Sequence, residues 1–518
     1  MSNVSKIYSA ELEGVDAKLI EVETDINVGL HSFTIVGLAD KALSEAKERV
    51  NSALKNVGVK PPTRENRKIV VNLAPADIKK TGSQYDLAIA IGYLLASGQI
   101  KEFDAKDKIF AGELSLEGKL RPINGALNIA RLAARLKYRY LILPEQNASE
   151  AAIVPGLKVI PASNLGQIID HLEGRNKISP QTPTEISTDN PQFSTANFVR
   201  LSEIKGQAHA KRALMIAAAG GHNLLMSGSP GTGKSMLAQA INSILPPMTL
   251  NEAIEVTQIY SAAGLLGDKP FLSSRPFRSP HQTASSAAIV GGGQNPKPGE
   301  ISLAHRGILF LDELPEFRRD ILEALRQPLE NGRVLVSRAK GNVVFPAKFM
   351  LVAAMNPCPC GYYNDPEKDC RCGAHEVLRY QKKISGPLLD RIDIQIEVPR
   401  VKIEHLRKTT IDYQEEKNIL NKIVLARQKQ TTRLAGKKIF INAEMSSKDC
   451  DQLIQFNKEA ERFLDEVFDK KFVSARGYFR ILKVAQTIAD LENSEKVTQD
   501  HLAEAFGYRL KEEIGLDV

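Results

Sequence analysis

Three features of the sequence predict an α/β protein built around a phosphate-binding sheet. Short apolar, strand-like runs alternate with helical runs through most of residues 1–400. A glycine-rich loop lies between an apolar run and a helical run at residues 223–245. Residues 401–518 are mainly helical in pattern. We therefore expect a parallel sheet with helices around it, followed by a helical bundle.

The length of 518 residues suggests about three domains. We place them at residues 1–173, 198–400 and 401–518, and we assign residues 174–197, rich in Pro, Ser, Thr and Asn, to a linker. The expected strands, in chain order, are 69–73, 140–144, 223–226, 308–311 and 349–356. The expected helices are 86–96, 128–136, 236–245, 401–432, 446–468, 477–491 and 498–510.

The composition is that of a soluble globular protein, with 43% hydrophobic and 25% charged residues. No apolar run is long enough to span a membrane, and the N-terminus does not resemble a signal peptide, so we expect a cytoplasmic protein. The net charge is +8, and residues 198–400 carry 24 basic and 18 acidic residues. This mild excess permits a polyanionic partner without requiring one.

The glycine-rich loop predicts a nucleotide site. Its sequence fits the pattern G-x-x-x-x-G-K-[ST], in which backbone N–H groups surround phosphates at a helix N-terminus. We expect Lys234 to contact the β- and γ-phosphates, and Ser235 and Asp312 to hold Mg²⁺. Glu313, the second acid after the 308–311 strand, is expected to activate the attacking water. The remaining loop residues expected to bind the nucleotide are Gly228, Ser229, Pro230, Gly231, Thr232 and Gly233.

Three further residues are candidates for the same chemistry. Asn356 ends a buried strand and could reach the γ-phosphate or the water, or it is a turn residue before Pro357. Arg391 lies between two acids and could reach the γ-phosphate of a neighbouring subunit, or it is a surface arginine in a salt bridge. Arg476 begins a helix, where a cation is disfavoured unless an anionic ligand offsets the cost.

Four of the five cysteines lie within 15 residues. Cys358, Cys360, Cys370 and Cys372 form two C-x-C pairs around a polar loop. Four thiolates suit a tetrahedral structural Zn²⁺, which we favour over free thiols, and they leave no open position for catalysis.

These motifs together resemble the AAA+ ATPases, in the branch that holds magnesium chelatase and the MCM-like motors. The resemblance assigns 228–235 to Walker A, Asp312 and Glu313 to Walker B, Asn356 to sensor 1, and Arg391 and Arg476 to the trans arginine finger and sensor 2. Residues 204–214, which include Gln207, resemble the segment that borders the adenine in these ATPases. The segments 279–281, 298–307, 325–330 and 356–361 resemble those of the ComM/YifB group of Mg-chelatase-like proteins, and this likeness covers nearly the whole chain. It implies an AAA+ core with an α-helical lid and the Cys-rich insert 358–372.

The first domain resembles the Lon-type protease domain, which has an S5-like α/β fold. The likeness is carried by residues 80–88 and 112–125. Aligned on these segments, the nucleophilic serine falls at Gln84 and the lysine at Leu127, and neither can form a Ser–Lys dyad. We therefore expect a Lon-like fold without peptidase activity.

Two basic segments are candidates for contacting DNA. Residues 332–346 predict a β-hairpin that turns at Lys340–Asn342, and in the MCM-like branch such hairpins line the ring pore. Arg338 and Lys340 would then contact phosphates without reading sequence. Lys269, Arg275 and Arg278 lie in a longer insertion at 248–294. An equally weighted alternative is that these are ordinary solvated surface charges.

The resemblance implies an ATP- and Mg²⁺-dependent ring motor, expected to be a hexamer. It would move DNA branches during homologous recombination, as in natural transformation. The rivals are a chelatase-type ATPase that inserts a metal and a protein-remodelling ATPase. Stimulation of ATP hydrolysis by DNA separates these possibilities.

Overall fold

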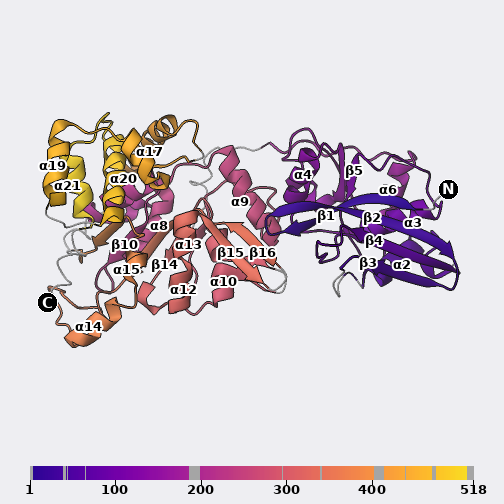
Figure 1. The fold of residues 1–518 in the computed structure, drawn as a ribbon, viewed down its shortest axis with the longest axis horizontal. Helices are drawn as coiled ribbons and strands as arrows, with labels where there is room; N and C mark the ends of the chain where they lie inside the picture. Colours follow the sequence, from indigo (N-terminus) through magenta and orange to yellow (C-terminus); the bar gives the residue numbers. More distant parts are fainter. Residues whose placement is uncertain are drawn as a thin grey trace.

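The computed structural model describes residues 4–38, 43, 45–64, 66–185, 199–293, 296–338, 341–401, 413–437, 439–469 and 474–509. The chain is elongated, with an N-terminal lobe at one end, a parallel sheet in the middle and helices of the C-terminal third at the other end (Figure 1). This arrangement confirms the predicted mixed α/β class with parallel strands. None of the described helices is long and apolar enough to cross a membrane.

The N-terminal lobe contains a four-stranded sheet in the order β1-β2-β4-β3. Strand β2 alternates buried and less buried positions, with Ile20, Val22 and Ile26 on the buried face against the apolar helix α3. The elements of this layer are β1 (Ser5–Glu13), β2 (Asp16–Val28), β3 (Ser32–Val36), α2 (Ala46–Asn56), the 3-10 helix η1 (Pro62–Arg64), β4 (Arg67–Ala74) and α3 (Asp86–Ala96).

A second, parallel sheet in the order β5-β8-β9 completes this lobe. Its elements are β5 (Lys108–Phe110), β6 (Glu113–Leu114), β7 (Leu120–Arg121), α4 (Ala126–Arg135), β8 (Tyr140–Pro144), α5 (Glu145–Ala151), β9 (Lys158–Ala162) and α6 (Leu165–Leu172). The first residues of the predicted linker, which begins at residue 174, still pack on the N-terminal lobe. Gln181 N–H donates to Val159 O at 2.8 Å and Thr184 N–H to Ala152 O at 3.2 Å, so the chain still follows the lobe there.

The middle of the molecule is a five-stranded sheet in the order β11-β14-β17-β10-β18, with parallel pairing throughout. Its strands β14 and β17 are buried at every position, as expected for a parallel sheet covered on both faces. The sheet and its first helices comprise η3 (Leu201–Glu203), α7 (Ala208–Gly220), β10 (Leu224–Ser227), α8 (Lys234–Ile244), β11 (Phe277–Arg278), β14 (Ile308–Leu311), β17 (Met350–Met355) and β18 (Ile394–Glu397).

The other elements of this middle region connect or flank the sheet. They are α9 (Leu250–Ala263), α10 (Ser286–Val290), β12 (Gly291–Gly292), β13 (Lys297–Pro298), α11 (Glu300–Leu303), η4 (Leu314–Glu316), α12 (Arg319–Ala324), α13 (Arg326–Asn331), β15 (Arg333–Arg338), β16 (Gly341–Pro346), α14 (Ala374–Gln381) and α15 (Gly386–Leu389). The predicted hairpin is β15–β16, but Arg338 pairs with Gly341. Gly341 and Asn342 therefore belong to the second strand and not to a turn, and residues 339–340 lie outside the described part of the chain.

The C-terminal third is helical over its described residues. It comprises α17 (Tyr413–Arg433), η5 (Asn442–Glu444), α18 (Ser447–Leu453), α19 (Lys458–Asp469), α20 (Ala475–Leu491) and α21 (Gln499–Gly507). The single helix predicted at 446–468 is wrong, because two helices occupy it. The chain between them pairs with Val497 through Gln455 O and Asn457 N–H, and the Asn457 side chain accepts from Ala460 N–H at the start of α19.

The contacts between the N-terminal lobe and the middle region include helix α4 and the β1–β2 turn. Helix α4 packs on α9, where Asn128 and Arg131 donate to the O and Oε1 of Gln258 at 3.3 and 2.6 Å. The β1–β2 turn lies on the β15–β16 hairpin, since a Cβ at Gly14 would be 2.7 Å from Val343 Cγ1. The predicted insertion 248–294 therefore includes the helix that joins the two parts.

Candidate nucleotide site

The glycine-rich loop lies at the carboxyl edge of the central sheet. It follows β10 and leads into α8, so its backbone N–H groups lie at the N-terminal end of that helix. Gly231 and Gly233 have φ values of 80° and 89°, which strain any other residue. Gly228 is needed for space, because a Cβ there would be 2.4 Å from Val398 O. The local sequence thus fixes the backbone of this loop.

Lys234 follows this loop directly, at the start of α8, and is buried, with 8% of its surface exposed. Its ammonium donates to Gly228 O at 2.7 Å, to Ser229 O at 3.0 Å and to Asn356 Oδ1 at 3.3 Å. Burial lowers the pKa of Lys234, while Asp312 and Glu313 raise it. The lysine therefore joins the loop to Asn356, which follows the neighbouring strand β17.

The two acids after β14 lie beside the start of α8. Ser235 Oγ donates to Asp312 Oδ2 at 2.7 Å, so a hydroxyl and a carboxylate that suit Mg²⁺ are already together. Glu313 is exposed and has a φ of 51°, an unfavourable conformation for a residue other than glycine. Its N–H donates to Asp312 Oδ1 at 2.9 Å, which holds the turn.

Gln207 lies on the flank of the loop. Its amide donates to Pro399 O at 2.6 Å and to Thr232 O at 3.4 Å. Six sequence-predicted residues are thus gathered at one edge of the sheet: Gln207, Lys234, Ser235, Asp312, Glu313 and Asn356. Their ammonium, hydroxyl, carboxylate and amide groups have the chemistry to hold phosphates and a divalent cation.

Arg391 lies at the opposite, amino edge of the sheet. Its carbonyl accepts from Asn223 Nδ2 at 2.9 Å, and Asn223 precedes β10 whereas the phosphate loop follows it. The Arg391 guanidinium donates to Glu330 at 2.6 Å and to Pro387 O at 2.6 Å, and 9% of the residue is exposed, so within its own chain Arg391 forms the salt bridge of the alternative interpretation. The proximity of Arg391 lowers the pKa of Glu330.

Arg476 is on the same side as Arg391. Its guanidinium is 3.9 Å from Glu330 and 64% exposed. Ser474 caps this helix by accepting from Gly477 N–H at 3.1 Å, so the arginine begins the first turn of α20 as predicted. The structure therefore brings Arg391 and Arg476 together, but away from the phosphate loop of their own chain. Glu330, the last residue of the 325–330 segment, joins them, although no role is predicted for it from the sequence.

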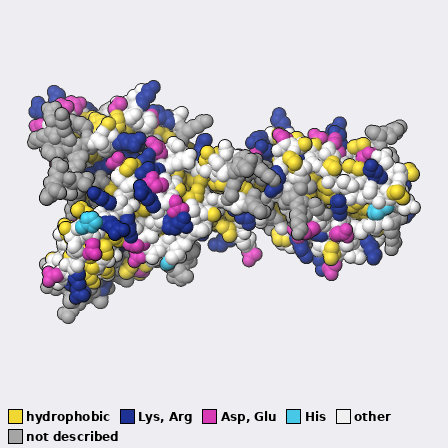
Figure 2. All heavy atoms as spheres, turned by 60° about the horizontal axis from the view of Figure 1, so that its bottom comes forward, with side chains coloured by type: hydrophobic (Ala, Val, Ile, Leu, Met, Phe, Trp, Pro, Cys, Tyr) yellow, Lys and Arg dark blue, Asp and Glu magenta, His cyan; other side chains and the backbone are white. Residues whose placement is uncertain are grey.

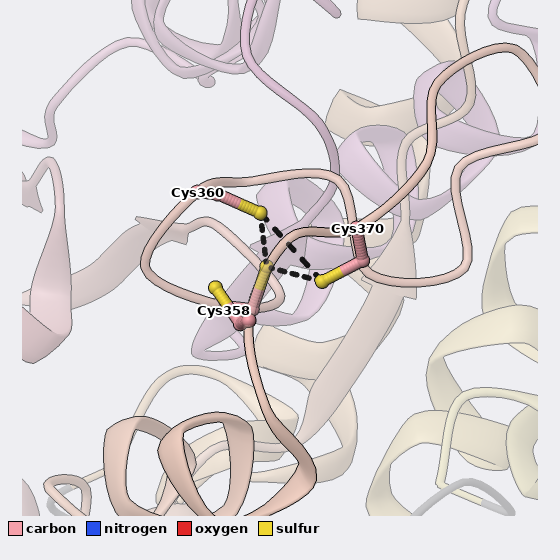
Figure 3. Close-up of side chains that lie close together, drawn as sticks. Cys358, Cys360 and Cys370 are labelled. Atoms are coloured by element: carbon pink, nitrogen blue, oxygen red, sulfur yellow. Dashed lines mark hydrogen bonds between the residues drawn. The ribbon is translucent and has the colours of Figure 1, made fainter.

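The four clustered cysteines bring their ligand atoms within 4.8 Å of one another. The Cys358, Cys360 and Cys370 sulfurs point toward a common centre, at separations of 3.4, 3.6 and 3.7 Å (Figure 3). Zinc–sulfur bonds of about 2.3 Å in a tetrahedron place sulfurs about 3.8 Å apart, so these separations fit the metal. Sequence spacing grouped these cysteines but did not reveal that Gly361 of this loop lies against Pro230 of the phosphate loop.

The candidate DNA-contacting residues have different environments. Lys269 is exposed. Arg278 is paired with Glu300 at 2.5 Å, while Arg275 is 9% exposed and bonded to Pro246 O, Arg306 O and Glu252. The prediction that Arg275 contacts DNA is therefore not supported, because its charge is used inside the fold.

The part of the chain that the structure describes does not include the side chains of the two hairpin candidates, Arg338 and Lys340. The Arg338 backbone pairs within β15–β16, whereas all of Lys340 lies outside the described residues. On the face in Figure 2, basic side chains are interspersed with acidic ones over both ends of the molecule.

The residues aligned with the protease dyad are engaged in the N-terminal lobe. Gln84 donates to Glu11 at 3.0 Å, and Leu127 is fully buried in α4. The nearby Ser83 hydroxyl donates to Glu113, and the Lys80 ammonium donates to Pro75 O. Burial lowers the pKa of Lys80.

Comparison with known families gives three consecutive matches. Residues 22–147 match the model described as subunit ChlI of Mg-chelatase. Residues 200–406 match magnesium chelatase, subunit ChlI, and residues 414–509 match its C-terminal part.

Relatives of known sequence match along nearly the full length. The chain is 45% identical to competence protein ComM of Haemophilus influenzae over 97% of both chains. It is 40% identical to YifB of Escherichia coli over 98% of this chain and 97% of that one. A shorter match, 27% identical over 30% of this chain and 20% of the other, is to Lon protease of Rhizobium meliloti.

Proposed function

The chain belongs to the family of Mg-chelatase-like AAA+ ATPases that includes ComM and YifB, and from this premise we propose that it is an ATP-hydrolysing ring motor that acts on DNA. The motor would migrate DNA branches and extend heteroduplex during homologous recombination, in the cytoplasm of a cell that takes up DNA. The observation that carries the proposal is the gathering of six nucleotide-site residues at one edge of the sheet, with Arg391 at the other.

Within this proposal each residue at the carboxyl edge has a role in hydrolysis. Lys234 and the loop N–H groups bind the β- and γ-phosphates, and Gln207 borders the adenine. Ser235 and Asp312 hold Mg²⁺, which neutralises charge on the phosphate oxygens. Glu313 accepts a proton from the attacking water, and Asn356 orients that water or the γ-phosphate.

The position of Arg391 and Arg476 supports a ring of identical subunits. A guanidinium stabilises the charge of a transferring phosphoryl group. Arg391 and Arg476, however, lie across the sheet from the phosphate loop of their own chain. A second copy that docks its amino edge against the first copy's phosphate loop supplies both arginines. Repetition of this head-to-tail contact closes a ring, and we propose six subunits.

The DNA substrate is supported by relatedness and weakly by charge. The relative that is 45% identical is named a competence protein, which connects it with DNA uptake. The net charge of +8 is compatible with a polyanion. We propose that Lys269, Arg278, Arg338 and Lys340 contact phosphates, without reading base sequence.

We also propose that the four thiolates hold a structural zinc ion. The separations of 3.4–3.7 Å among the Cys358, Cys360 and Cys370 sulfurs support this site, and the Cys372 sulfur lies within 4.8 Å of them.

A strand-exchange assay tests the proposed motor. The full chain is incubated with ATP, Mg²⁺ and a labelled synthetic junction with homologous arms, alongside Lys234→Ala. We expect ATP-dependent branch movement by the wild type alone. Absence of movement, with ATP hydrolysis that is indifferent to any DNA, would overturn the DNA substrate.

A chelatase-type or protein-remodelling ATPase is the alternative. The match of residues 200–406 to a chelatase subunit favours it. Under this alternative the ATPase rate responds to a protein partner and not to single-stranded, double-stranded or branched DNA. The comparison of these rates therefore separates the two functions.

A further inference from the structure

The cysteine loop lies directly against the phosphate loop. Gly361 has a φ of 84°, and a Cβ there would be 2.6 Å from the ring of Pro230. The same position is 3.8 Å from Asn356 Cγ. Only the absence of a side chain at Gly361 permits this approach. The first ligand, Cys358, is two residues after Asn356 and is fully buried.

Asp365, in the same loop, has a buried side chain on which the phosphate loop acts. Its side chain is 1% exposed, and one oxygen accepts from Glu367 N–H at 2.9 Å and Lys368 N–H at 3.0 Å. The other oxygen is 3.2 Å from Arg400 Nε. The Ser229 hydroxyl of the phosphate loop is the main cause of the lowered pKa of Asp365.

Arg400 connects the loop to the end of β18. Its guanidinium lies 5.7 Å from the Tyr362 ring centre and pairs with Glu367 at 3.0 Å. Residues 361–369 have no helix or strand, and most of them are exposed. Their order therefore depends on the four sulfurs at their ends and on the contacts of Asp365 and Arg400.

We infer that the metal-closed loop Cys358–Cys372 positions the phosphate loop for ATP, with Asp365 and Gly361 as the positioning residues. The metal closes the loop, the closed loop presents Gly361 and Asp365 to Pro230 and Ser229, and these contacts keep the phosphate-binding backbone in place. Loss of the metal releases the loop and lowers the affinity for ATP without removing any residue that touches the nucleotide. This inference rests on the proposed nucleotide site.

The test measures zinc content and nucleotide affinity on the full chain. Zinc per chain is determined by elemental analysis, and the dissociation constant of a fluorescent ATP analogue with Mg²⁺ by titration. We expect one zinc in the wild type and in Cys450→Ala, a distant buried cysteine, and none in Cys372→Ser. The zinc-free variant should bind the analogue about tenfold more weakly, as for loss of a charge-assisted contact.

Asp365→Ala tests the contact without touching a ligand. It should keep its zinc and its melting temperature, raise KM for ATP severalfold and change kcat less. Asp369→Ala, an exposed acid of the same loop, is the matched control and should match the wild type in all of these. Zinc-stripped wild-type protein replaces Cys372→Ser if that variant does not fold.

The outcomes separate the two proposals. Absence of zinc from the wild type, or equal affinity with and without it, overturns the inference. Equal KM for Asp365→Ala and Asp369→Ala overturns it as well. A wild type that binds the analogue no better than Lys234→Ala overturns the proposed function itself.

Discussion

Glu313 stands in a left-handed turn at the open side of the phosphate loop. Such a backbone costs of order 1 kcal/mol for a residue with a side chain, and here the Glu313 N–H bond to Asp312 maintains it. Glu313 is exposed, whereas Asp312 is bonded to Ser235. The two adjacent acids thus have separate surroundings, as their proposed roles at the cation and at the water require.

We predict that Glu313→Gln binds ATP but hydrolyses it about 10² to 10⁴ times more slowly, because an amide cannot accept the proton. Phosphate release and analogue binding measure the two effects. Glu316→Gln is the matched control, since Glu316 is three residues further on and pairs with Lys383 at 3.2 Å on the surface. A rate in Glu313→Gln equal to that of Glu316→Gln would remove Glu313 from the mechanism.

At the scale of elements, Asp393 joins helix α20 to the start of strand β10. Its carboxylate accepts from Asn223 N–H at 2.9 Å and pairs with Arg480, while the ring of His222 is 3.7 Å away. Burial raises the pKa of Asp393. The neighbouring Arg480, His222 and Lys483 outweigh this effect and lower the pKa of Asp393 below its usual range. The ionised form therefore stabilises the folded state.

We predict that Asp393→Asn lowers the stability by about 3 kcal/mol at pH 7, because it leaves Arg480 without its buried partner. The folded pKa is below the unfolded value of about 3.9, so the stabilisation is complete above the unfolded value, declines below it and is lost as the pH falls through the folded pKa. Thermal unfolding at pH 7 and pH 3 should therefore show a smaller difference from wild type at pH 3. The exposed Asp451→Asn control should show no difference at either pH. A gap that is the same at pH 7 and pH 3 would assign the loss to packing.

The N-terminal lobe allows a negative prediction. Ser83 and Lys80 are bonded to Glu113 and Pro75 O, and the aligned positions Gln84 and Leu127 carry neither nucleophile nor amine. Degradation of fluorescent casein with ATP should therefore stay at the rate of buffer alone. Ser83→Ala should not change ATP hydrolysis. Casein cleavage that Ser83→Ala abolishes would refute the expected loss of peptidase activity.

At the scale of the whole molecule, the proposed ring requires each copy to carry half of two sites. The phosphate loop is at one edge of the central sheet, and Arg391 and Arg476 are at the other. Under this proposal a single chain presents an incomplete site at each edge, and the direction of the sheet sets the direction of assembly.

A mixing experiment tests this division. We predict that Arg391→Ala and Glu313→Gln are each nearly inactive, and that an equimolar mixture regains ATP hydrolysis. In the mixture the intact phosphate loop of one variant meets the intact arginine of the other. Mixing Glu313→Gln with Lys234→Ala is the control and should regain nothing, since no interface is then complete. If neither mixture regains activity, the arginine does not act between subunits.

The sequence alone determined the elements whose signals are local. Helix α3 at Asp86–Ala96 and strand β8 at Tyr140–Pro144 have the predicted bounds, because an apolar run between breakers depends on neighbours within a few residues. The phosphate loop could be read for the same reason, since glycine spacing sets its backbone. The four cysteines could be grouped because they are close along the chain.

Tertiary structure decided what depends on distant partners. The helix predicted at 446–468 is interrupted by pairing with Val497, some forty residues later in the chain. Arg275, an apparent surface charge, is buried against Glu252. Whether a residue reaches the carboxyl or the amino edge of the sheet depends on the parallel strand order, which put Arg391 far from Lys234 and Asp365 beside Ser229. Periodicity and spacing are properties of neighbours along the chain, whereas burial, charge pairing and the edge of a sheet exist only after the chain has folded.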